Sequence, residues 1–257
     1  MDPNDHIIQP SDLKSGDILL CVGTGQLASI VTARTKSSYT HSAICYSPAE
    51  VGHIHVTVEK VPIGEFIQVF KYIAVFRAPD FWTEQRISKL REFIDGKVGP
   101  GTTYDDEAAR SLMKRQKAHQ IESFEKLREH FEDGMPEPEH NKAKYVCTEF
   151  VTACLAEVGI WGDGMKTGYQ PNTLHPGNQG HDASFGYLVG FLRDDPATVI
   201  PDNDEFACSM TNGMTYGEWL EIAKDLADSP PSTDQNLSQG EIENLLQSFS
   251  TNTDANP

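Results

Sequence analysis

The spacing of apolar residues changes near residue 83, and this change constrains the fold more than any other feature of the sequence. Before it, short apolar runs lie between Gly- and Pro-containing turns, and residues 53–61 alternate between apolar and polar side chains, as strands do. After it, apolar residues recur every three or four positions, as in residues 87–94, which indicates helices. Strands followed by helices are typical of an α+β fold.

The same reading gives approximate bounds for the elements. Strands are expected at residues 18–22, 40–46, 53–61 and 184–192, with one or two more in 66–79. In the strand 53–61, Ile54, Val56 and Val58 are expected on one face and His53, His55, Thr57 and Glu59 on the other. Helices are expected at residues 26–35, 83–96, 106–133, 147–158 and 216–226, and loops at 96–106 and 162–180.

Composition excludes several classes of protein. The 38 acidic and 21 basic residues give a formal net charge of −17, which argues against binding to nucleic acid or to an anionic membrane. No apolar run approaches the roughly 18 residues of a membrane helix. The first ten residues lack the basic and apolar regions of a secretory signal, so a cytoplasmic location is expected. Delivery into another cell by a signal-independent route stays open.

The cysteines and histidines show no metal or disulfide pattern. The five cysteines, at positions 21, 45, 147, 154 and 208, are odd in number and form no CxxC pair. The nine histidines form no HExxH motif. We therefore expect neither a disulfide framework nor a zinc site, and no cofactor.

Cys147 stands at the predicted start of a helix whose apolar stripe includes Phe150, Val151 and Leu155. The positive end of the helix dipole and its unpaired N–H groups favour a thiolate, and the same N–H groups can stabilise an oxyanion on a substrate carbonyl. The alternative is a buried, inert cysteine, which is the commoner fate of a lone cysteine. The helix alone leaves both interpretations open.

A nucleophilic thiol needs a base, and His41 is the candidate because it begins a predicted strand, where an imidazole can reach the edge of a site. Glu59, His55 and His53 share the polar face of the neighbouring predicted strand, and any of them could orient the imidazole. The alternative is that His41 is a surface histidine and that this polar face meets solvent.

Several segments together resemble a known family. The stretches "DLKSGDILLCV", "SSYTHSAICY", "VTVEK", "GTTYDD" and "YVCTEFVTACLAEVGI" occur in this order over roughly residues 10–192. They resemble the permuted papain-fold amidases of the YaeF/YiiX group, which are relatives of the NlpC hydrolases and of lecithin:retinol acyltransferase. The resemblance implies a circularly permuted papain-like fold, in which an antiparallel sheet packs on helices. The segment at about 106–143 would be a helical insertion before the nucleophile.

The resemblance also implies roles for individual residues. Cys147 would be the nucleophile, His41 its base and Glu59 the residue that orients His41; in some relatives a second histidine has that role, which keeps His55 and His53 in consideration. Tyr145 and His55 would contact the substrate. Tyr104 and Asp105 match a pair that we interpret as architectural. The implied activity is hydrolysis of an amide bond in a peptide or peptidoglycan-type fragment.

Two other functions remain open. A thiol acyltransferase or phospholipase of the same superfamily often works at membranes, with an apolar anchor or basic surface that this acidic chain lacks. A non-enzymatic binding module on this fold is the second alternative. Faster labelling of Cys147 than of the other cysteines would favour either enzyme.

The C-terminal part is expected to be separate from a hydrolase domain at residues 1–228. Residues 229–257 predict an acidic linker and an amphipathic helix, in which Ser238 and Glu241 have the spacing of a capping box. The helix at 236–250 resembles the docking segment at the start of flagellar switch proteins, which indicates a protein partner. Docking of this helix on its own domain is the alternative.

Overall fold

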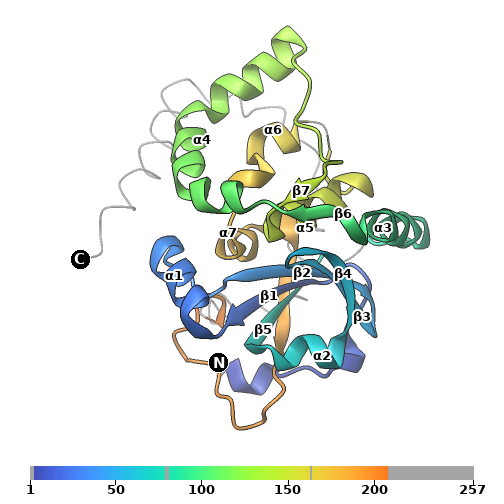
Figure 1. Ribbon diagram of the computed structural model, residues 1–257, viewed down its shortest axis with the longest axis vertical. Coiled ribbons are helices and arrows are strands. Elements are labelled where there is room, and N and C mark those ends of the chain that lie inside the picture. The colour runs from blue at the N-terminus through green and yellow to red at the C-terminus, as the bar shows by residue number, and fades with distance from the viewer. Residues whose placement is uncertain (1–2, 79–80, 163, 208–257) are drawn as a thin grey trace, which may run out of the picture. The chain divides into compact units, whose positions relative to one another are not determined.

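An eight-stranded sheet with the strand order β7-β6-β4-β3-β2-β1-β5-β8 organises the protein (Figure 1). The computed structural model describes residues 3–78, 81–162 and 164–207. All of these belong to one unit, Met1–Gly213, and the second unit, Met214–Pro257, lies outside them. The predicted helix at 216–226, the linker and helix at 229–257 and Cys208 therefore lie outside the described residues.

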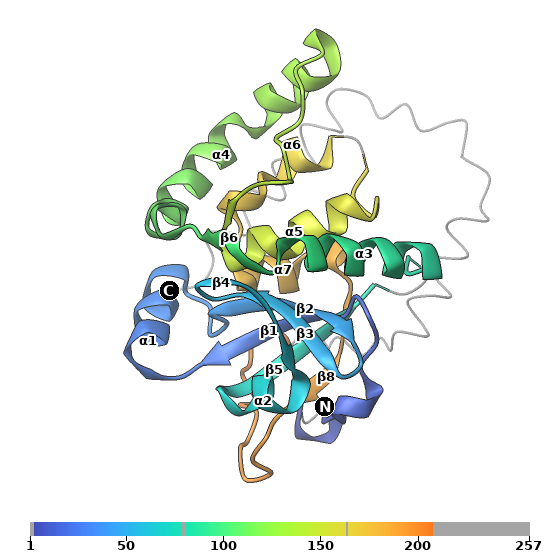
Figure 2. The same cartoon turned by 45° about the vertical axis from the view of Figure 1, so that its right-hand side comes forward.

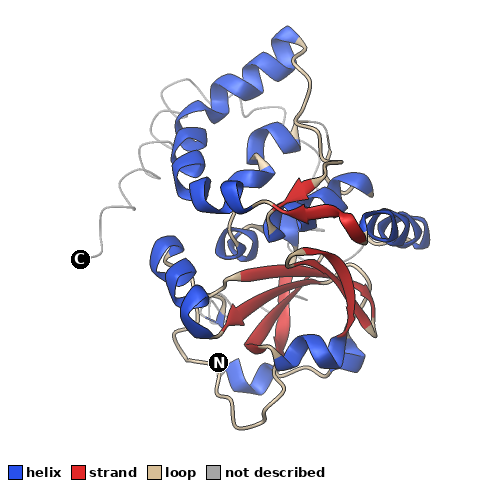
Figure 3. Cartoon of the chain, viewed as in Figure 1, coloured by secondary structure: helices blue, strands red, loops and turns tan. Residues whose placement is uncertain are grey.

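The sheet is curled and almost entirely antiparallel; only β6 and β7 pair in parallel. The α+β class predicted from the sequence is thus confirmed for the described residues (Figure 3). The strands are β1 (Ile18–Gly23), β2 (His41–Ser47), β3 (Glu50–Ile54), β4 (Thr57–Pro62), β5 (Phe70–Arg77), β6 (Gly99–Tyr104), β7 (Lys144–Tyr145) and β8 (Tyr187–Leu192). The α-helices are α1 (Gly25–Thr35), α2 (Ile63–Gln68), α3 (Glu84–Lys97), α4 (Asp106–Asp133), α5 (Cys147–Glu157), α6 (Met165–Tyr169) and α7 (Pro176–His181).

Helices cover both faces of the sheet, as Figure 2 shows for α3 and α5 on one side and α2 on the other. Successive side chains of a strand point to opposite faces. Ile18 and Leu20 of β1 therefore belong to the core under α3 and α5, whereas Leu19 and Cys21 belong to the core under α2. Because both faces are buried, the sequences of the strands in the middle of the sheet are nearly continuous apolar runs.

The helix α4 has the bounds predicted from the sequence. The Asp105 carboxylate accepts a hydrogen bond from the backbone N–H of Ala108 at its start, and Gly134 ends it with a left-handed φ of 69°. The apolar residues of this helix are only partly buried. Leu112 is buried, but the side chains of Ile121 and Phe124 are 77% and 85% exposed. Ile121 and Phe124 are exposed because α4 packs on α6 and on residues 171–173 through another part of its surface.

Residues 53–61 do not form one strand. The chain reverses at His55 and Val56, so that β3 and β4 make an antiparallel hairpin in which His53 lies opposite Glu59. Val56, expected on the same face as Ile54, is 67% exposed at this turn. A tight reversal keeps the alternation of apolar and polar residues on either side of it, and the sequence pattern therefore does not reveal the turn.

Three other predictions are corrected. Residues 66–68, expected in a strand, belong to α2, whose residues Phe66 and Ile67 pack on the sheet. The glycine-rich stretch expected as a loop at 96–106 contains β6, which β4 and β7 hold in the sheet. The stretch expected as a loop at 162–180 contains α6, α7 and a 3₁₀ turn at Pro171–Thr173. No helix among the described residues has the length and apolar character needed to cross a membrane.

A buried ion pair joins the residue before β1 to the last residue of β5. Asp17, 1% exposed, precedes β1 and accepts two hydrogen bonds of 2.7 Å from the guanidinium of Arg77 at the end of β5. Asp17 also accepts from the backbone N–H of Lys14, and this contact fixes the turn before the strand. Two-point pairing of a guanidinium with a carboxylate is the strong form of such a contact.

Replacing Asp17 with Ala is expected to lower the free energy of unfolding by about 3 kcal/mol, because it leaves the Arg77 charge without its partner in a largely buried place. Asp95→Ala is the matched control. Asp95 pairs with Lys60 at the surface, and its loss should cost about 1 kcal/mol or less. Urea unfolding of both variants measures the difference, and equal losses would contradict the assignment.

Candidate active site

Cys147 is the first residue of α5, and Val146 before it is extended. Nine of the eleven residues of this helix, Cys147–Leu155, are buried. The sequence predicted one apolar stripe, but the helix is enclosed more fully because it lies between the sheet, α3 and the turn at 171–173. Cys147 thus has the predicted position at a helix start, in surroundings more buried than expected.

The side-chain amide of Gln179 fixes the start of α5 to the strand β2. It accepts a 2.6 Å hydrogen bond from the Ser42 hydroxyl and donates one of 3.2 Å to the carbonyl of Thr148. Gln179 is fully buried. Sequence reasoning missed Gln179 because it lies in α7, within the segment expected as a loop, and nothing in the local pattern marks it.

The Cys147 thiol is buried, with 6% exposure, against the backbone N–H of Ser42. Burial raises its pKa to about 11, while the backbone N–H groups of Ser42, Thr148 and Cys147 itself act in the opposite direction. The N–H groups at the helix start thus lower the pKa in the expected direction, but burial outweighs them.

His41, the first residue of β2, directs its ring to the α2 side of the sheet. Its Nε2 lies 3.2 Å from Nδ1 of His53, and its ring stacks on Phe70 with centroids 5.7 Å apart. Burial lowers the pKa of His41 to about 3, with a further contribution from His53 and His55. Burial, and then His55, lowers the pKa of His53 to about 4. Both rings are therefore neutral near pH 7.

The three residues proposed to orient His41 differ in position. His53 contacts His41 directly, and Oε1 of Glu59 lies 3.9 Å from Nε2 of His53. His55 is exposed at the turn of the hairpin. His53 therefore lies between His41 and Glu59 in space. The hairpin of β3 and β4 produces this arrangement because it places Glu59 opposite His53.

His41 and Cys147 are close in the fold, but no hydrogen bond joins them among the described residues. The thiol lies against the backbone of Ser42, the neighbour of His41 in β2. The Ser42 side chain faces Gln179 of α7, whereas the His41 ring faces Phe66 and Phe70 on the other side of the strand.

The tyrosines named from the sequence have structural contacts. The Tyr145 hydroxyl, fully buried, donates to the carbonyl of His140 and accepts from the backbone N–H of Lys142. It thereby holds the segment that leads to β7. Burial, together with the nearby Cys147, raises the pKa of Tyr104 above its ordinary value. Asp105 caps α4, which is an architectural role.

Two hollows lie elsewhere in the described part of the molecule. A cavity of about 270 Å³ is lined by α4, by residues 138–142, by Glu149 and Ala153 of α5, and by residues 170–172. A more open one of about 300 Å³ lies between α4 and residues 168–182. Neither includes Cys147. The described residues contain no group of three or more His, Cys, Asp or Glu side chains suited to a metal ion.

Comparison with known proteins gives a distant structural likeness. No family model and no curated protein matches the chain. Among solved structures, the metalloprotein YiiX of Escherichia coli O157:H7 matches with 16% sequence identity and a TM-score of 0.39, over 57% of this chain and 67% of that one.

The raised pKa of Cys147 predicts slow alkylation. At pH 7, native Cys147 should react with iodoacetamide more slowly than in urea-unfolded protein, because only the thiolate reacts and burial disfavours it. The native rate should reach half its maximum near pH 11, whereas the unfolded rate should reach half its maximum near about pH 8.5. Mass spectrometry that resolves Cys147 from Cys154 measures both. Fast labelling at pH 6 would instead indicate a thiolate paired with imidazolium.

Proposed function

We propose that this protein is a cysteine-dependent hydrolase that cleaves an amide bond in a peptide or a peptidoglycan-type fragment, with Cys147 as nucleophile and His41 as base. The observation that carries the proposal is the position of the Cys147 thiol at the first turn of α5, against the backbone N–H of Ser42 and one residue along β2 from His41. The order of the sequence motifs, with histidine before cysteine, is a second support.

The hydrogen-bond pattern suggests which nitrogen of His41 is the base. Oε1 of Glu59 lies 3.9 Å from Nε2 of His53, too far for a hydrogen bond, but its negative charge favours hydrogen on that nitrogen. Nδ1 of His53 then accepts from Nε2 of His41, which leaves Nδ1 of His41 with a free lone pair. In this scheme His53 is the positioning residue, and Glu59 acts only through it.

The chemistry starts from a neutral thiol and a neutral imidazole. As Sγ of Cys147 forms a bond to the substrate carbonyl carbon, its proton moves to Nδ1 of His41. The N–H groups at the start of α5 stabilise the negative charge on the carbonyl oxygen. The C–N bond then breaks, His41 returns the proton to the leaving amine, and a thioester remains on Cys147. Water, deprotonated by His41, hydrolyses the thioester and releases the acid.

The proposal requires His41 to turn toward Cys147 when substrate binds. In the substrate-free structure its ring stacks on Phe70. Because the ring and the thiol lie on opposite sides of β2, a rotation of the side chain alone does not join them, and the start of β2 must also rearrange in the substrate complex.

Two alternative functions would use the same site in other ways. An acyltransferase would pass the thioester acyl group to an acceptor other than water. A binding module is favoured by one observation: the thiol is neutral and buried, and both hollows lie away from it. In a binding module no covalent intermediate forms on Cys147.

Cys147→Ala is expected to lower amide hydrolysis by on the order of 10⁴-fold, because the covalent route is lost. The assay incubates the protein with a panel of N-acyl amino acid amides and short peptides, and intact-mass spectrometry detects the acyl-enzyme. Cys154→Ala, on the same buried helix, is the control and should keep the activity. An unchanged rate in Cys147→Ala would exclude the nucleophile, and an adduct on another residue would relocate it.

His53→Gln is expected to lower the rate by about 10- to 100-fold, as for other residues that orient a functional histidine. Glu59→Gln should have a smaller effect, because Glu59 is 3.9 Å from His53 and has no direct contact with His41. Glu84→Gln, at the exposed start of α3, is the control. Profiles of kcat against pH distinguish orientation from loss of folding. A larger effect of Glu59 than of His53 would contradict the order of the three residues.

A further inference from the structure

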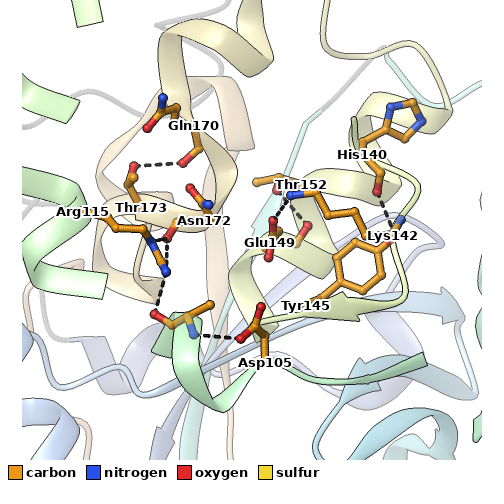
Figure 4. A network of polar contacts seen from close by, with 11 residues as sticks. Asp105, Arg115, His140, Lys142, Tyr145, Glu149, Thr152, Gln170, Asn172 and Thr173 are labelled. Atoms are coloured by element: carbon orange, nitrogen blue, oxygen red, sulfur yellow. Dashed lines mark hydrogen bonds and ion pairs between the residues drawn. The ribbon is translucent and has the colours of Figure 1, made fainter. Parts of the chain in front are cut away.

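A polar cavity of about 270 Å³ between α4 and α5 has no part in the proposed chemistry. Figure 4 shows its walls: Arg115 and Asn172 lie on one side, and Lys142 and Glu149 on the other. Cavities that hold drug-sized ligands begin at roughly 300 Å³, so this one suits a smaller molecule.

Arg115 gives the cavity a positive charge without an acidic partner. Its guanidinium donates to the carbonyls of Asn172 and Ala108 and to the hydroxyl of Ser111, all of which are neutral. No ion pair of Arg115 occurs within the described residues, although the chain carries 38 acidic residues. A partly buried guanidinium held by neutral oxygens favours an anionic ligand.

The other two cations of the lining are already paired. Lys142 forms a 2.7 Å ion pair with Glu149, whose side chain is 6% exposed. Lys126 pairs with Glu122 on its own helix. Arg115 is therefore the lining cation without an ion-pair partner among the described residues, and one N–H of its Nη1 is left to donate to a ligand.

His119 supplies a second unsatisfied group. It is 8% exposed, and its Nε2 lies 2.6 Å from the carbonyl of Gly168, so Nε2 carries the hydrogen. Nδ1 of the neutral ring is then an acceptor, and it is buried without a hydrogen-bond partner among the described residues. An unpaired buried polar atom costs free energy unless a ligand or water satisfies it.

The backbone at residues 170–172, which lines the cavity, has an uncommon conformation and is held by side-chain hydrogen bonds. Gln170, in the lining, has a left-handed φ of 43°, which is uncommon for a residue other than glycine. The Thr173 hydroxyl donates a hydrogen bond to the carbonyl of Gln170, and the Arg115 guanidinium donates one to the carbonyl of Asn172. Strained backbone of this kind is concentrated at ligand sites.

We propose that this cavity binds a small carboxylate that also carries a hydrogen-bond donor, such as a free amino acid or a small hydroxy acid. The carboxylate accepts from Arg115, and the ammonium or hydroxyl group donates to Nδ1 of His119. Glu139, exposed in the lining, adds attraction for an ammonium group. The site is independent of the proposed hydrolase, because it uses the face of α5 with Glu149 and Ala153 and does not include Cys147.

Isothermal titration of the whole chain with the twenty free amino acids and L-lactate tests the proposal. Ethanolamine, which lacks the carboxylate, and inorganic phosphate, a different anion, are the comparison ligands. At least one carboxylate of the panel should bind saturably, and ethanolamine and phosphate should not. The absence of saturable binding across the panel, or binding of phosphate in preference to every carboxylate, would overturn the proposal.

Two variants then locate the site. Arg115→Gln should weaken binding by about 10- to 100-fold, the effect of losing a charged hydrogen bond. Arg110→Gln removes the same charge from α4 outside the cavity lining and should bind as wild type. Since Arg115 also holds backbone carbonyls, Ala118→Phe provides an independent test: it fills the cavity and removes no side-chain hydrogen bond. Wild-type affinity in both Arg115→Gln and Ala118→Phe would exclude the cavity.

Discussion

The buried amide of Gln179 is the contact on which the candidate active site depends. It joins the Ser42 hydroxyl of β2 to the Thr148 carbonyl of α5. Ser42 follows His41 and Thr148 follows Cys147 in the chain, so this contact positions the backbone at both candidate residues. A buried amide is stable only when its donors and acceptors are satisfied, so the bridge fixes one register of helix on strand. Its loss would leave the buried Ser42 hydroxyl without this acceptor and would remove the hydrogen bonds that tie the start of α5 to β2.

Burial sets the protonation states around this contact. It raises the pKa of Cys147 and lowers the pKa values of His41 and His53, so that all three groups are neutral at pH 7. The site therefore differs from one that stores a thiolate and an imidazolium in its resting state. Proton transfer would accompany attack on the substrate, and the pairing of His41 with His53 keeps one imidazole nitrogen available for it.

Features that depend on residues close together in the chain could be predicted from the sequence. The helix predicted at 106–133 has those bounds in the structure, where Asp105 and Gly134 cap it, and Cys147 lies at a helix start as predicted. The reversal at His55 and Val56 was missed because alternation is the same on both arms of a hairpin. Gln179 and the cavity around Arg115 and His119 arise from segments far apart in the sequence, and their contacts leave no local pattern.

The distance between Nδ1 of His41 and Sγ of Cys147, measured in a crystal structure with an acyl group trapped on Cys147, tests the central claim most directly. The claim is that these two residues act as one catalytic pair although the substrate-free structure directs the His41 ring to Phe70. The account predicts that the imidazole turns and comes within about 4 Å of the sulfur. A ring that stays stacked on Phe70 and bonded to His53, with the acyl group in place, would contradict it.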